Sequence, residues 1–136
     1  MNNQRGKPTY ILSGKIIEGK KIGTAAGFPT ANMNTKDLKS LPPNGVYISA
    51  LFWNKEWHKG ITNVGNRPTV DDDDEISIET HLLNFDEDIY GESVEVLLFE
   101  KIRDTIKFES LDALAEQIEK DEDSVKIFFK EHEGSR

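Results

Sequence analysis

The sequence predicts an all-β domain, an antiparallel barrel or sandwich that is followed by one C-terminal helix. Apolar and polar residues alternate with period two in several segments of the first two thirds of the chain, and these segments are rich in β-branched residues. Turn-forming residues separate the segments at short spacing, with no helical pattern between them. From Ser110 onward the apolar period changes to that of a helix.

Five segments are predicted to be strands: residues 10–18, 45–53, 57–64, 76–85 and 92–103. Gly14 inside the first segment indicates a bulge or a close approach of another backbone. Asn54 and Lys55 predict a tight hairpin turn between the second and third segments. Residues 71–75 are all acidic, and we interpret them as a solvated loop rather than a metal site, because adjacent side chains of an extended loop do not converge.

The helix is predicted over residues 110–132. Ser110 is a suitable N-cap, and Asp112 in the first turn complements the helix dipole. Apolar residues recur at helical spacing and predict packing against the barrel: Leu111, Leu114, Ala115, Ile118, Val125, Phe128 and Phe129. With 136 residues the chain is predicted to be one domain, divided into a flexible segment 1–9, a barrel 10–109 and the helix.

Composition excludes several classes of function. The chain has 17 Lys and Arg against 25 Asp and Glu, a net charge of −8, so neither nucleic acid nor an anionic membrane is expected as the main partner. The absence of cysteine excludes disulfides, thiolate nucleophiles and cysteine-ligated zinc. Since the polar N-terminus lacks a signal-peptide pattern and no apolar run is long enough to span a bilayer, we expect a cytoplasmic protein.

Residues 19–32 (GKKIGTAAGFPTAN) form the first candidate site. Glycines allow backbone N–H groups to approach a bound anion, although the segment matches neither the dinucleotide fingerprint nor the P-loop, and a plain surface loop is the alternative. Thr30 and Asn32, two residues apart, would point to the same side of an extended chain. Their oxygens suit Mg²⁺ held together with substrate phosphates, while ordinary turn chemistry is the alternative.

Two further groups are candidates. Glu79, on the strand face opposite Ile78, could accept a proton from a hydroxyl group at the barrel mouth, or simply face water. We interpret His81 as an orienting or structural group. Arg103 and Phe108 bracket a short segment before the helix, and both side chains stack well on flat heterocycles; a charged strand end and an apolar plug under the helix are the alternatives.

Taken together, these segments resemble the riboflavin kinase family, including the kinase module of bacterial bifunctional riboflavin kinase/FAD synthetases. The resemblance runs from Tyr10 to Phe129 and rests on five motifs in the family's order: GFPTAN (27–32), LPPNGVY (41–47), TNVGNRPT (62–69), ETHLLNFDEDIYG (79–91) and IRDTIKFESLDAL (102–114). It implies a closed antiparallel Greek-key barrel of about six strands with the helix packed outside. It also implies transfer of the γ-phosphoryl group of ATP to the 5′-hydroxyl of riboflavin, which yields FMN and ADP.

The resemblance also implies roles for individual residues. Glu79 would be the catalytic base, and Thr30 with Asn32 would hold Mg²⁺, or Mn²⁺ or Zn²⁺ in its place, and the nucleotide phosphates. The other residues implied on the nucleotide side are Gly19, Thr24, Leu82, Asn84 and Tyr90. The residues implied on the flavin side are Arg103, Ile106 and Phe108.

One position departs from the family pattern. Most members carry Lys or Arg where this chain has Thr24, so we expect weaker ATP binding unless Lys20 or Lys21 compensates. Nothing in the chain resembles the adenylyltransferase half of the bifunctional enzymes, and we expect the reaction to stop at FMN. We expect a monomer whose partners are riboflavin, FMN, ATP and ADP. The alternatives are a flavin-binding module without turnover and an unrelated barrel that serves as an interaction domain.

Overall fold

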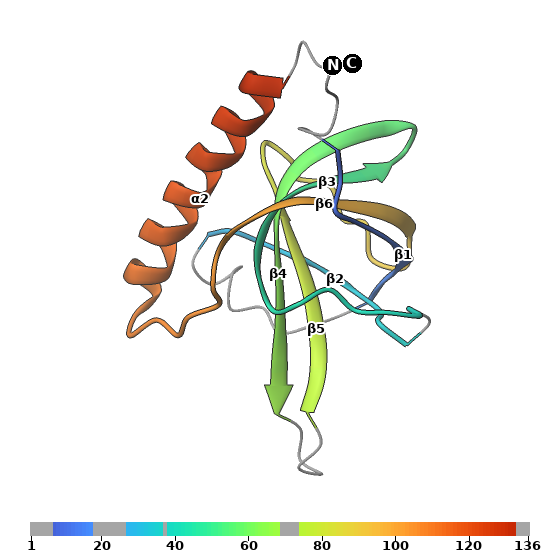
Figure 1. Cartoon of the computed structure of the whole chain (residues 1–136), viewed down its shortest axis with the longest axis horizontal. Coiled ribbons are helices and arrows are strands. Elements are labelled where there is room, and N and C mark those ends of the chain that lie inside the picture. The colour runs from blue at the N-terminus through green and yellow to red at the C-terminus, as the bar shows by residue number, and fades with distance from the viewer. Residues whose placement is uncertain (1–6, 18–26, 37, 69–73, 133–136) are drawn as a thin grey trace.

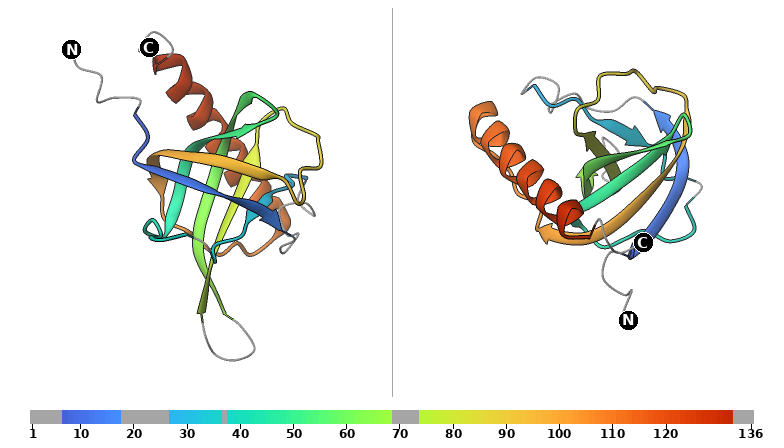
Figure 2. Two further views of the ribbon diagram at one scale, coloured as in Figure 1. Left: turned by 90° about the vertical axis from the view of Figure 1, so that its right-hand side faces the viewer. Right: turned by 90° about the horizontal axis from the view of Figure 1, so that it is seen from above.

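A computed structural model describes residues 7–17, 27–36, 38–68 and 74–132. Its strands are β1 (Tyr10–Ile17), β2 (Ala31–Met33), β3 (Gly45–Trp53), β4 (Glu56–Pro68), β5 (Asp74–Leu82) and β6 (Ser93–Arg103), followed by the helix α2 (Leu111–His132). The strands close into an antiparallel barrel in the order β1-β2-β5-β4-β3-β6, and α2 lies along one side of it (Figures 1 and 2). The predicted six-stranded barrel with an outer helix is therefore confirmed.

The hairpin between β3 and β4 agrees closely with the prediction. β3 has the predicted bounds, and Trp53 pairs with Glu56 across the turn. Asn54 and Lys55 have φ angles of 55° and 68°, the left-handed values that a two-residue hairpin turn requires at both central positions. The close approach of another backbone predicted at Gly14 is also present, because a Cβ atom there would lie 3.2 Å from the Asn34 carbonyl oxygen.

The prediction missed β2, because Gly27 and Pro29 indicated a loop and a three-residue strand is too short to show alternation. β2 pairs with β1 through Ile16 and Met33 and with β5 through Asn32 and Glu79, so it closes the barrel.

β4 and β5 also differ from their predicted bounds. Their pairing continues to Pro68 and Asp74, so Asp74 and Glu75 belong to a strand and not to the predicted acidic loop; residues 71–73 lie outside the described ranges. Backbone pairing with β4 outweighs the low strand propensity of these acidic residues. Figure 1 shows this ribbon extending below the barrel. At its other end β5 stops at Leu82 rather than at residue 85, and Asn84 has a φ of 52° that turns the chain away.

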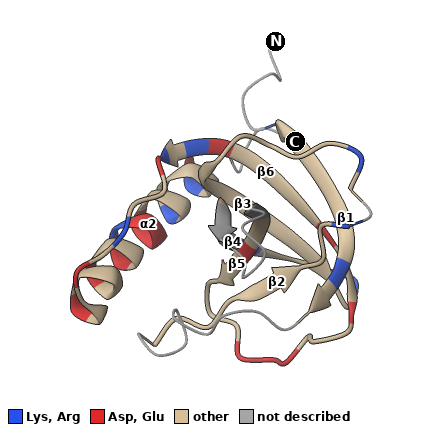
Figure 3. Ribbon diagram, turned by 90° about the horizontal axis from the view of Figure 1, so that it is seen from below, with Lys and Arg blue, Asp and Glu red and all other residues tan. Residues whose placement is uncertain are grey.

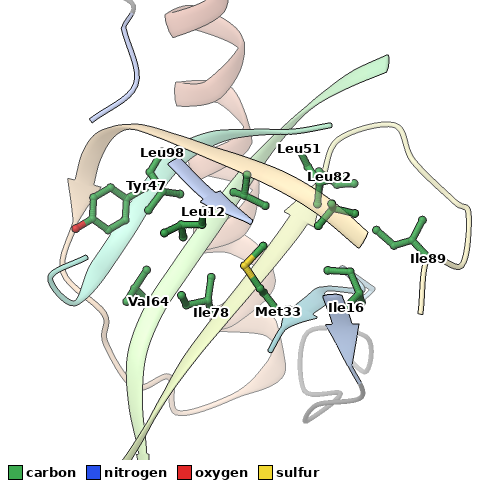
Figure 4. Packing of buried hydrophobic residues seen from close by; sticks show 12 residues of the cluster. Leu12, Ile16, Met33, Tyr47, Leu51, Val64, Ile78, Leu82, Ile89 and Leu98 are labelled. Carbon is green, nitrogen blue, oxygen red and sulfur yellow. The ribbon is translucent and has the colours of Figure 1, made fainter. Parts of the chain in front are cut away.

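The barrel interior is filled by aliphatic side chains from every strand. Leu51, Val64, Ile78 and Leu98 have no measurable exposure, and Figure 4 shows them among the other side chains of the cluster. The full cluster is Leu12, Ile16, Met33, Tyr47, Leu51, Val64, Ile78, Leu82, Ile89, Val94, Val96 and Leu98. Burial raises the pKa of the Tyr47 hydroxyl, which donates a hydrogen bond to the Pro43 carbonyl.

A second, smaller core joins α2 to the outer barrel wall. It contains Val46, Ile48, Ile61, Val125 and Phe128. The Ser110 hydroxyl accepts a hydrogen bond from the backbone N–H of Ala113 at 3.1 Å, which confirms the predicted N-cap. No helix of the described ranges is both long and apolar enough to span a membrane. Thr9, expected in the flexible N-terminal segment, donates from its hydroxyl to the Phe99 carbonyl of β6 at 2.7 Å.

Replacing Gly60 by alanine is expected to destabilise the fold by about 1–3 kcal/mol, because the new methyl group would overpack the β4–β5 contact. A Cβ atom at Gly60 would lie 2.8 Å from the His81 carbonyl oxygen. Gly65→Ala is the matched control on the same strand, since its Cβ atom would meet nothing closer than 3.8 Å. Urea unfolding of both variants measures the difference, and an equal effect of the two substitutions would contradict this account.

Candidate functional site

Two cavities lie side by side on the barrel and share Thr30. The first has a volume of about 530 Å³ and is formed by the ends of β1 and β5, the segment that enters β2, and the loop 85–90. The second has a volume of about 650 Å³ and lies between the outer barrel wall, the segment 103–110 and the first half of α2. Because Thr30 lines both cavities, a ligand in one can approach a ligand in the other at this residue.

The first cavity collects most of the residues predicted for the nucleotide. Asn32, Leu82 and Tyr90 line it together with Thr30. Asn84 does not line it, because it occupies the left-handed turn after β5. Gly19 and Thr24 lie outside the described residues. Asp86, Glu87 and Asp88 form part of the wall of this cavity, and Figure 3 shows the acidic stretch in the loop between β5 and β6.

Thr30 and Asn32 are positioned by the entry into β2. Gly27 has a φ of 94°, which a residue with a Cβ atom adopts only at a cost, and the chain then runs extended into the strand. Both residues line the first cavity, and Asn32 is only 6% exposed. In the described part of the chain no three His, Cys, Asp or Glu side chains converge as a metal site. Thr30 and Asn32 would offer a metal neutral side-chain oxygens, which bind Mg²⁺ together with the phosphates of a ligand.

Glu79 lies on the outer face of β5 and lines the second cavity, opposite the interior residue Ile78. The carboxylate accepts hydrogen bonds from the Thr30 hydroxyl at 3.2 Å and from the Ser77 hydroxyl at 2.9 Å. The predicted strand face, opposite Ile78, is confirmed, but this face is the outer wall of the barrel and not its mouth, and α2 and the segment 103–110 enclose Glu79 there. A partly buried carboxylate held by two hydroxyl groups is fixed in orientation for proton transfer.

The apolar wall of the second cavity comes from the segment after β6 and from α2. The residues predicted for the flavin side all line this cavity: Arg103, Ile106 and Phe108. Across from them α2 contributes Leu111, Leu114 and Ile118. An apolar slot with polar groups at one end suits a flat heterocycle that carries a hydroxylated chain.

The Arg103 guanidinium group is held within the protein. Its Nε and Nη2 atoms donate to the Asp121 carboxylate at 3.0 and 2.7 Å, and Nη1 donates to the Asp104 carbonyl at 3.1 Å. The Phe108 ring lies against it, with 5.8 Å between Arg103 Cζ and the ring centroid. Arg103 therefore shapes the cavity wall through Phe108.

A surface ion pair marks the point where the chain leaves β6. The Lys101 ammonium group donates to the Asp104 carboxylate at 2.8 Å. This hydrogen bond raises the pKa of Lys101 and lowers the pKa of Asp104, so both groups stay charged at neutral pH.

Asn63 and Asp121 are polar residues of the second cavity that were not predicted. Asn63 pairs with Glu79 in the β4–β5 register, and its side-chain oxygen accepts a hydrogen bond from the Thr105 hydroxyl at 2.8 Å. Asp121 lies on the apolar face of α2, three residues after Ile118 and four before Val125. An acidic residue on an otherwise apolar helix face was a signal available in the sequence, because buried carboxylates require partners.

Comparison with known proteins agrees with this architecture. The family model described as "Flavokinase: Riboflavin kinase" matches residues 6–129. Bifunctional riboflavin kinase/FMN adenylyltransferases of Listeria monocytogenes and Haemophilus influenzae are 38% and 42% identical over 94% and 93% of this chain. The chain spans about two fifths of the length of these relatives, at 40% and 41%.

Two solved structures share the fold. One, described as a macrolide-efflux protein from Streptococcus pneumoniae, has a TM-score of 0.80 and 33% identity, and the match covers 89% of this chain and 39% of that one. The riboflavin kinase of Trypanosoma brucei has a TM-score of 0.59 at 23% identity over 88% of this chain and 79% of that one. The barrel with its outer helix is thus the architecture of a riboflavin kinase domain. This chain belongs to the riboflavin kinase (flavokinase) family.

Proposed function

We propose that this chain transfers the γ-phosphoryl group of ATP to the 5′-hydroxyl of riboflavin. The observation that carries the proposal is the meeting of two cavities at Thr30, with Glu79 in one and Asn32 in the other. Phosphoryl transfer requires from a protein mainly in-line positioning of two substrates, charge neutralisation and one base for the nucleophile. Family membership supports the identity of both substrates.

In this proposal the nucleotide occupies the first cavity. Thr30 and Asn32 would hold Mg²⁺ and the nucleotide phosphates, and Leu82 and Tyr90 would contact the rest of the nucleotide. The divalent metal, when bound, neutralises phosphate charge, which allows a chain of net charge −8 to bind ATP.

Riboflavin would occupy the second cavity, with its ring system against Ile106 and Phe108 and its ribityl chain directed toward Glu79. The 5′-oxygen attacks the γ-phosphorus, the bond from that phosphorus to the β–γ bridging oxygen breaks, and ADP leaves. The proton of the 5′-hydroxyl passes to the Glu79 carboxylate. Since every residue of this arrangement comes from one chain, a monomer suffices for the reaction.

The test is chromatographic detection of FMN after the chain is mixed with riboflavin and Mg-ATP. FMN formation would support the proposal. Flavin binding without turnover would instead favour the flavin-binding module, for which the Thr24 departure from the family pattern is the specific sequence observation. Failure both to bind and to convert riboflavin would overturn the proposal.

A further inference from the structure

We propose that two adjacent acidic residues of α2, Asp121 and Glu122, hold the two walls of the site at a fixed separation. Asp121 holds the flavin-side segment 104–110 through Arg103, and Glu122 holds the nucleotide-side segment before β2 through His81. Both are positioning residues, since neither is placed against a reacting atom. The inference rests on the proposed function for the identity of the two ligands, and on contacts of the described residues for the rest.

Asp121 is buried, and both oxygens of its carboxylate accept hydrogen bonds. The residue is 2% exposed, and its carboxylate accepts hydrogen bonds from two nitrogens of Arg103 and from Gln117 Nε2 at 3.0 Å. Arg103 is the last residue of β6, and the chain that follows it carries Ile106 and Phe108 into the second cavity. Removing the carboxylate would leave the partly buried guanidinium group of Arg103 without its partner. The start of the segment 104–110 would then no longer be held to α2.

The contact of Glu122 reaches the other wall. Its Oε2 atom lies 2.8 Å from His81 Nε2, and His81 Nδ1 lies 3.1 Å from the Pro29 carbonyl oxygen. That carbonyl is an acceptor, so Nδ1 donates to it, and Nε2 donates to Glu122 when the ring is protonated. Pro29 directly precedes Thr30, whose hydroxyl donates to Glu79. The Phe28 ring packs edge-on against His81, with 5.3 Å between centroids, and completes this wall.

Helix geometry explains why two neighbouring residues can serve opposite walls. Successive side chains of an α-helix are rotated by about 100°, so Asp121 and Glu122 point in different directions from the same turn. The helix is itself anchored to the barrel by Val125, one turn further on, which has no measurable exposure. One rigid turn thereby sets the separation of the two walls. In-line transfer is sensitive to displacements of about 1 Å, for which rate losses of about a hundredfold are typical.

The proposal predicts opposite substrate selectivity for two variants. Asp121→Asn is expected to raise KM for riboflavin between about tenfold and a hundredfold while KM for ATP changes less than about twofold. Glu122→Ala, which removes the partner of His81 Nε2, is expected to raise KM for ATP selectively. Asp123→Asn removes the same charge from the next residue, which is exposed and makes no side-chain hydrogen bond or ion pair within the described part of the chain, and should leave both constants unchanged. If Asp121→Asn does not fold, Arg103→Lys can be tested in its place, because lysine keeps the positive charge but cannot make the bidentate contact with Asp121.

Hydrogen exchange of the unliganded protein gives a readout that does not depend on turnover. Asp121→Asn should accelerate exchange in residues 104–110 and leave residues 27–33 unchanged. Glu122→Ala should accelerate exchange in residues 27–33 and leave residues 104–110 unchanged. Equal changes of both KM values, or equal changes of the exchange rates in both segments, in either variant would overturn the inference. The proposed function would still stand if the unmodified chain forms FMN. If the unmodified chain forms no FMN, the proposed function fails, and the exchange pattern alone decides the inference.

Discussion

Replacing Glu79 by glutamine is expected to lower kcat for FMN formation by about a hundredfold to ten-thousandfold, the usual contribution of a general base. Glutamine preserves the size of the side chain and an oxygen that can accept a hydrogen bond from the Thr30 hydroxyl. It cannot take up the proton of the 5′-hydroxyl of riboflavin. KM for riboflavin should change little, because Glu79 occupies only the end of the second cavity nearest Thr30. Steady-state kinetics with both substrates varied measure the two constants separately.

Glu100→Gln is the control for the loss of one carboxylate from a strand. Glu100 is an exposed residue of β6 outside both cavity linings, and its replacement should leave kcat unchanged. A Glu79→Gln variant that retained kcat within a few-fold of the unmodified chain would show that another group accepts the proton. The proposed role of Glu79 would then be wrong, although the assignment of the two cavities would stand.

Replacing Phe128 by alanine is expected to lower the free energy of unfolding by about 3–5 kcal/mol. Phe128 is 6% exposed and joins α2 to the barrel, with 5.4 Å between its ring centroid and that of Phe99. The loss is a large part of the total stability of a domain of this size, which is about 5–15 kcal/mol. Because α2 also forms one wall of the second cavity, riboflavin binding should weaken in the same variant. Urea unfolding and quenching of riboflavin fluorescence measure the two effects.

Ile127→Ala is the matched control on the same helix. Ile127 is adjacent to Phe128 but 57% exposed, so truncation removes little buried surface. We expect a change in unfolding free energy of less than about 1 kcal/mol and no change in riboflavin binding. Similar losses for both variants would mean that α2 is not held by the face that the structure assigns.

Most of the barrel could be predicted from the sequence because its signals are local. Strand alternation, the Asn54–Lys55 turn and the Ser110 cap each depend on residues within a few positions of one another, and all three were confirmed. β2 could not be predicted in this way. Its three residues form a strand only because β1 and β5 provide partners on both sides.

The candidate site, too, could be predicted from the sequence only in part. Sequence motifs selected Thr30, Asn32 and Glu79, and the structure brings these residues to the boundary of the two cavities. The motifs did not reveal that α2 and the segment 103–110 enclose Glu79, nor that Arg103 is bound to Asp121. Figure 3 shows several acidic residues along α2, and Asp121 differs from them in lying buried on the apolar face, where it meets Arg103.

The sequence by itself determined the fold class, the family and the residue types available for chemistry. The tertiary structure decided which of those residues act together. The contacts that build the site join residues 49 positions apart for Thr30 and Glu79, 41 for His81 and Glu122, and 18 for Arg103 and Asp121. Local periodicity carries no information over such separations, because those contacts depend on barrel closure and on where α2 packs.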